Sequence, residues 1–288
     1  MSRGTRWRIA GYVFALVGIA FTAVALWQTW QRSQQSLLPD GGAMLIAAVL
    51  VLAGALAAGW SWLALFAREG DWRLLGDFYL AQLGKYIPGG LWQPAGQVGL
   101  TVGAGFTATR ATANFAMHVV IQFAAGVWLG GLLFFDGAQP FWLRAVAGLG
   151  LLAPILIYRN LTWAILRRFG GLLRLDSDEL APPEQSVILR SFIWTVGCLV
   201  AYGLAYGFLA NSLESSIGIA VSIPAFALAW AIGFALVVFP AGLGAREAAL
   251  VVLVGGVPAV AIAASIGLRL VVISGELAIA LVSRVGRS

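Results

Sequence analysis

Six predominantly apolar runs of 22 to 25 residues follow one another along this chain, and they limit most strongly what it can fold into. They cover residues 9–30, 43–67, 113–135, 187–210, 217–239 and 258–282. A helix of about 20 apolar residues, rising 1.5 Å per residue, crosses the hydrocarbon core of a bilayer. The runs therefore predict an integral membrane protein, and the shorter run 141–158 adds a further span.

The composition agrees with this prediction. Hydrophobic residues make up 60% of the 288 positions and charged residues only 10%, whereas soluble domains carry about 25% charged residues. The net charge of +6 would suggest a nucleic-acid partner in a soluble protein, but here arginines in cytoplasmic loops explain it. We expect an all-α, polytopic membrane protein with about seven or eight membrane helices. Residues 1–288 would form a single domain.

Arginines predict the orientation of the chain. Arg3, Arg6 and Arg8 precede the first run, which places the N-terminus in the cytoplasm of a multi-pass protein of the cell (inner) membrane. The run 9–30 is longer than the apolar part of a signal peptide, so we expect it to stay uncleaved. Residues 161–175 mix arginines with apolar side chains, as an interfacial helix does.

Residues 74–110 interrupt the pattern of spans. Pro88 and Pro94 bracket the Gly89–Gly90 pair, and no straight helix continues through such a sequence. The segment before the break is too short to cross a bilayer. We therefore predict a re-entrant hairpin on the cytoplasmic side, shielded from lipid by protein or a wet cavity.

A second break resembles the first. Residues 240–243 (Pro-Ala-Gly-Leu) match residues 88–91 (Pro-Gly-Gly-Leu) at a distance of 152 positions, and the short segment 248–256 follows as a half-helix. Paired breaks in two halves of a membrane protein are typical of inverted repeats with a site between them. The halves here would be residues 1–140 and 141–288.

Lys85, beside the first break, is the only lysine among 18 basic residues. A charge at membrane depth is costly, so it needs a partner or a function. Three interpretations are open: contact with a lipid phosphate, an ion pair with Asp77 on the same helix face, or snorkelling to the interface. Gln82 and Tyr86 lie beside Lys85 in the sequence.

Four charged residues accompany the second break and the last run: Arg246, Glu247, Arg269 and Glu276. Structural bridges, either Arg246–Glu276 or Glu247–Arg269, are one interpretation. The other is a carboxylate that gates transport or couples it to protons.

Asn114, His118 and Gln122 lie four residues apart on one helix face. They either bond neighbouring helices or line a pathway. The chain has one histidine and one cysteine, and no serine, cysteine or metal-ligand constellation suggests catalysis. We therefore expect no enzymatic activity, no metal and no cofactor.

Residues 85–90 (Lys-Tyr-Ile-Pro-Gly-Gly) with Trp92 and Gln93, together with residues 239–247, resemble the hallmark segments of the lysylphosphatidylglycerol synthase transmembrane region family. These are flippase-like proteins related to the N-terminal flippase half of multiple peptide resistance factors. The resemblance implies re-entrant segments and a role in moving lipids between leaflets. We expect the chain to differ from the fused members in having no soluble synthase domain. Its Lys-Tyr-x-Pro-Gly form is similar to stand-alone members linked to envelope polysaccharide assembly.

These observations predict a translocase for a phosphate-bearing lipid, either a polyprenyl-phosphate-linked sugar or a modified phospholipid, in cell-envelope assembly. Lys85 and Arg246 would bind the phosphate. The headgroup or cleft would be shaped by Gln82, Tyr86, Trp92 and Gln93. Counter-charges or gates would be Asp77, Glu247, Arg269 and Glu276.

Two other classes of function remain open. One is a membrane scaffold that docks a glycosyltransferase or lipid synthase through residues 159–184, and the other is a transporter of a small anion. The oligomeric state is also open, a homodimer included.

Overall fold

The computed structural model describes residues 39–86, 92–170, 183–213, 217–235, 244–255 and 257–285. The predicted first span, 9–30, and the Pro-Gly breaks at 88–91 and 240–243 lie outside these ranges. Within them the secondary structure is entirely helical, which confirms the all-α fold.

Four described helices are long and apolar enough to cross a membrane. They are α2 (Gly41–Ala64), α5 (Ala108–Gly131) extended by η2 (Leu132–Phe135), α8 (Gln185–Ser212) and α11 (Pro258–Val285). They correspond to four of the predicted runs. Elsewhere the match is looser.

The predicted spans 141–158 and 217–239 appear as shorter helices. α6 (Phe141–Gly150) ends before the separate 3₁₀ turn η3 (Ala153–Ile157). Pro154 explains this break, because it has no N–H to donate to the carbonyl of Gly150, four residues earlier, and its ring clashes with that carbonyl in an α-helix. α9 (Ile219–Ala235) has 17 residues and contains Pro224. α7 (Arg159–Gly170) forms where the interfacial helix was predicted.

Polar caps define where several helices begin. The side chain of Asp40 accepts a hydrogen bond from the Ala43 amide at the start of α2. Asp71 does the same for Arg73 and Leu74 at the start of α3 (Trp72–Gln82). Such caps satisfy amides that the helix itself cannot, so they stabilise the starts of α2 and α3.

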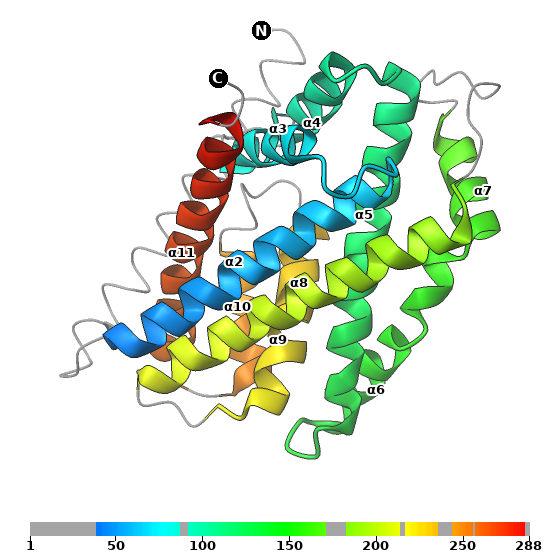
Figure 1. The fold of residues 1–288 in the computed structure, drawn as a ribbon. Coiled ribbons are helices and arrows are strands. Elements are labelled where there is room, and N and C mark those ends of the chain that lie inside the picture. Colours follow the sequence, from blue (N-terminus) through cyan, green and yellow to red (C-terminus); the bar gives the residue numbers. More distant parts are fainter. Residues whose placement is uncertain are drawn as a thin grey trace, which may run out of the picture.

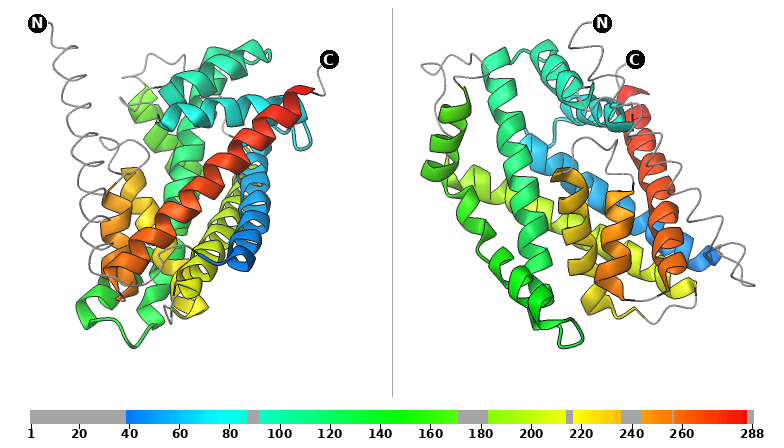
Figure 2. Two further views of the ribbon diagram at one scale, coloured as in Figure 1. Left: turned by 90° about the vertical axis from the view of Figure 1, so that its left-hand side faces the viewer. Right: turned by 180° about the vertical axis from the view of Figure 1, so that it is seen from behind.

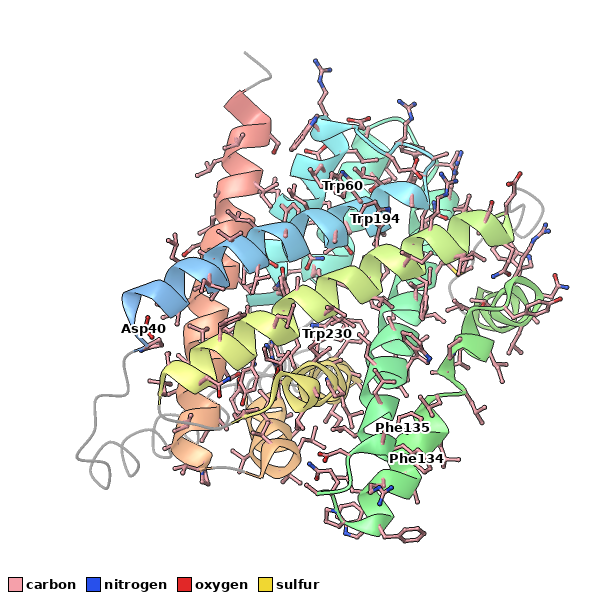
Figure 3. All side chains as sticks on the ribbon, turned by 60° about the horizontal axis from the view of Figure 1, so that its bottom comes forward. Asp40, Trp60, Phe134, Phe135, Trp194 and Trp230 are labelled. Atoms are coloured by element: carbon pink, nitrogen blue, oxygen red, sulfur yellow. The ribbon has the colours of Figure 1, made fainter. Side chains whose placement is uncertain are left out.

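α2 and α8 lie side by side and antiparallel, and they cross α5 obliquely (Figure 1). A buried hydroxyl cluster joins them, because the Ser61 hydroxyl lies 2.9 Å from that of Ser191 and 2.7 Å from that of Thr195. Trp60 and Trp194 pack against each other nearby, with ring centroids 4.8 Å apart (Figure 3). α11 contacts both helices and also α3.

Two pairs of short helices lie toward opposite ends of the molecule. α3, η1 (Leu83–Tyr86) and α4 (Trp92–Gly103) form one pair at the end where α11 finishes. α9 and α10 (Ala245–Val254) form the other and lie against each other nearer the opposite end (Figure 2, right). Each pair flanks one predicted break. Short helices therefore lie on both sides of each break, where an uninterrupted span would need one long helix.

The outer surface is strongly apolar. Leu45 on α2, Phe141 on α6 and Leu281 on α11 are each exposed to more than 60%. Large apolar side chains exposed on several helices are more stable in contact with lipid than with water. Together with the four apolar helices, it identifies a membrane protein.

Candidate functional site

A cavity of about 380 Å³ is lined by residues of both pairs of short helices and of α2, α5, α8 and α11. Its charged lining consists of Lys85, Arg246, Arg269 and Glu276. Its uncharged polar lining includes Gln82, Gln93, Gln97, His118, Gln122, Thr195 and Tyr202. Three cations thus face one carboxylate among the described lining residues. With Glu247, which pairs with Arg269, one net positive charge remains, which favours an anionic occupant.

Lys85 pairs with Glu276 across the cavity. Its Nζ lies 2.5 Å from the Glu276 Oε1, although the two residues are 191 positions apart. Glu276 is only 4% exposed. The sequence did not predict this pair. Asp77, the partner suggested by helix spacing, is half-buried on α3 and is not among the residues that line the cavity.

The predicted Glu247–Arg269 bridge is confirmed. The Glu247 Oε1 lies 2.9 Å from both Nε and NH2 of Arg269. The same carboxylate accepts hydrogen bonds from the Gly244 amide (2.8 Å) and the Ser265 hydroxyl (3.0 Å). Glu247 therefore completes the N-terminus of α10 and joins it to α11, behind the cavity wall.

Arg246 enters the cavity from the first turn of α10. Its guanidinium carbon lies 4.3 Å from the centroid of the Phe226 ring, which is cation–π geometry. The turn before it depends on Gly244, whose φ of +85° suits glycine and strains other residues. The short helix and its glycine start thus direct this cation inward.

Two of the predicted headgroup residues meet within α3, η1 and α4, which we call the first hairpin; α9 and α10 form the second hairpin. The Gln93 Nε2 donates to the Gln82 Oε1 at 3.0 Å, so the two amides join α4 to α3. Gly84 permits this approach, because a Cβ there would lie 2.8 Å from the Gln93 backbone nitrogen. Trp92, which was predicted to shape the site, is 51% exposed and is not among the residues that line the cavity. The Tyr86 side chain lies outside the described residues.

The polar stripe on α5 divides between its two interpretations. Asn114 donates to the Leu65 carbonyl at 2.9 Å and so ties α5 to the end of α2. His118 and Gln122 line the cavity instead.

Gln97 is the residue that sequence reasoning missed. It is 2% exposed and lines the cavity. Its position four residues after Gln93 puts both amides on one face of α4, and this spacing was the available signal. Within the described residues, no group of three or more His, Cys, Asp or Glu side chains could hold a metal ion.

No protein-family model matches the chain, and no curated protein sequence matches it. The family resemblance of residues 85–93 and 239–247 therefore stays a prediction.

Proposed function

We propose that the protein moves a phosphate-bearing lipid between the leaflets of the cell membrane. The observation that supports this most is the cavity, in which three cationic side chains and one carboxylate converge: Lys85 and Arg246 from the two pairs of short helices, and Arg269 and Glu276 from α11. Its volume of about 380 Å³ falls in the range of small-molecule sites, roughly 300–1,000 Å³. It suits a headgroup, while the acyl or prenyl chains stay in the surrounding lipid.

Lys85 and Arg246 form the proposed phosphate clamp. They reach the cavity from different hairpins, so one phosphate between them would bridge η1 and α10. Without lipid, Glu276 compensates the charge of Lys85. A phosphate competes with Glu276 for the lysine, and this exchange couples headgroup binding to the contact between α11 and the first hairpin. Translocation would follow from the alternating movement of the two hairpins around the bound headgroup.

Transfer in proteoliposomes tests the proposal. The substrate is a fluorescent polyprenyl phosphoryl-sugar, and the measurement is its protection from a membrane-impermeant quencher. A hydrogen bond to a charged group contributes about 1.5–3 kcal/mol, so Lys85→Gln and Arg246→Gln should each slow transfer by roughly 10-fold or more. Arg190→Gln is the matched control, because Arg190 pairs with Glu69 at 2.9 Å on the surface, and its side chain is 52% exposed.

Unchanged transfer in both clamp variants would show that the phosphate clamp is wrong. The scaffold alternative makes the opposite prediction: removing residues 159–184 abolishes envelope assembly in cells, while the clamp variants keep it. Size-exclusion chromatography of each variant separates loss of function from loss of folding.

A further inference from the structure

We infer that Gln97 and His118 form a second subsite in the cavity, which binds the hydroxyl groups of an uncharged sugar headgroup beside the phosphate. The inference rests on the proposed function and specifies the chemical class of its substrate.

The side chain of Gln97 is buried without hydrogen-bond partners in the part of the chain that the structure describes. Its Oε1 and Nε2 are both buried, and neither has a hydrogen-bond partner among the described residues. Buried amides nearly always have partners, because burial removes their hydrogen bonds to water and this loss is costly unless the protein or a ligand replaces them. The exception here borders a cavity. A ligand in the cavity that supplies one donor and one acceptor would satisfy both atoms of this amide.

His118 shows the same feature from the neighbouring helix α5. It is 2% exposed, and its Nε2 is buried without a hydrogen-bond partner among the described residues. Trp62 and Phe78 hold its ring edge-on, with centroid distances of 5.4 and 6.0 Å. The imidazole is therefore fixed by packing, and a polar atom is held at the cavity for another molecule.

The uncharged polar side chains of this subsite suit the hydroxyl groups of a ligand better than its charged groups. An amide offers both donors and an acceptor, and a neutral imidazole offers one of each, which is the pattern that sugar hydroxyls complement. Gln122 adds a further amide to the lining. Trp230 and Phe234, stacked with centroids 5.0 Å apart, provide an apolar wall for the carbon face of a sugar ring.

A cationic headgroup fits less well. The described lining carries three cations and one carboxylate; Lys85 pairs with that carboxylate and Arg269 pairs with Glu247, so one net positive charge remains. An aminoacyl headgroup would add positive charge to this excess. The cavity therefore favours a glycosylated phosphodiester over an aminoacylated lipid.

Affinities of the full-length protein in lipid nanodiscs test the subsite. The probes are geranyl phosphoryl-glucose and geranyl methyl phosphate, which are phosphodiesters of equal charge that differ in the sugar. We expect the glucose probe to bind at least about 5-fold more tightly, since it gains two or more hydrogen bonds, each of which strengthens binding by about 2-fold or more. Gln97→Leu and His118→Phe should reduce this ratio to less than about 2-fold. Neither should weaken the methyl probe.

Thr101→Val is the matched control. Thr101 lies one turn further along α4 and is as buried as Gln97, but it does not line the cavity. This variant should keep the affinity ratio. Gln97→Leu should also keep or raise the melting temperature without ligand, because it removes a buried amide without a partner. A lower melting temperature together with a lost ratio would assign Gln97 a purely structural role and overturn the inference.

The remaining outcomes separate this inference from the proposed function. Equal affinity for both diesters, with both weakened by Arg246→Gln, overturns the sugar subsite and leaves the phosphate clamp intact. Binding of neither diester overturns both proposals. If lysylphosphatidylglycerol binds more tightly than the glucose probe, the headgroup is cationic and the sugar subsite is wrong.

Discussion

Glu247 and Glu276 are buried to the same degree, 3% and 4% exposed, yet their surroundings give them different tasks. Glu247 accepts hydrogen bonds from the backbone amide of Gly244, which caps α10, and from the Ser265 hydroxyl and the Arg269 guanidinium on α11. Glu276 lines the cavity and contacts Lys85. These contacts favour the counter-charge role for Glu247, whereas under the proposed function Glu276 makes the exchangeable contact.

Replacing Glu247 tests its structural role. Glu247→Gln removes the charge that satisfies these donors and should lower the free energy of unfolding by about 2–3 kcal/mol, since hydrogen bonds to charged groups contribute about 1.5–3 kcal/mol. Denaturant unfolding in detergent measures the change. Glu184→Gln is the control, because Glu184 is exposed, and surface substitutions change stability by less than about 0.5 kcal/mol. Equal effects of the two variants would contradict the assignment.

At the scale of elements, the first hairpin depends on close backbone contact. A Cβ at Gly84 would lie 2.8 Å from the Gln93 nitrogen and 2.8 Å from the Trp92 carbonyl carbon. Both are backbone atoms, which cannot rotate away as a side chain can. The glycine therefore sets the distance between η1, which carries Lys85, and α4, which carries Gln93 and Gln97.

Gly84→Ala should consequently separate η1 from α4. Overpacking of this kind costs about 1–3 kcal/mol, and displacement of Lys85 should slow lipid transfer by roughly 10-fold in the proteoliposome assay. Gly99→Ala on α4 is the control, because nothing lies within 4 Å of its added Cβ. It should stabilise the helix by about 0.5–1 kcal/mol. Normal transfer by Gly84→Ala would show that the hairpin does not position the clamp.

At the scale of the molecule, arginines gather at one end of the membrane helices. Arg68 follows α2, Arg110 lies at the start of α5 and Arg190 at the start of α8. The other ends of α2 and of the α5–η2 span carry Asp40 and Asp136. The positive-inside rule predicts that the arginine end, which also carries the first hairpin, faces the cytoplasm.

Cysteine labelling tests this orientation. The background is Cys198→Ala, which removes the single, buried cysteine. Ala138→Cys, in the exposed turn after η2, should react with a membrane-impermeant maleimide in intact cells. Ala104→Cys, in the exposed turn between α4 and α5, should react only after permeabilisation. The reverse pattern would invert the topology and place the first hairpin outside.

The sequence alone determined the elements of this fold. Runs of apolar residues specify helices that lipid can surround, and proline or glycine ends them, because both effects act within a few residues of the chain. Even the Glu247–Arg269 bridge, 22 positions apart, was among the sequence predictions, since its members belong to neighbouring segments. Arg246, Lys85, Gln82 and Gln93 were likewise recognised as site residues, and all four line the cavity.

Only the tertiary structure decided which of these elements face one another. Lys85 meets Glu276 across 191 positions, Gln97 and His118 border the same cavity, and Trp92 lies on the surface. Helix spacing says which side chains share a face, but it contains no information on the partner that this face packs against. Among helices that are apolar all round, that choice depends on close packing of small residues and on the few buried polar groups that must find partners.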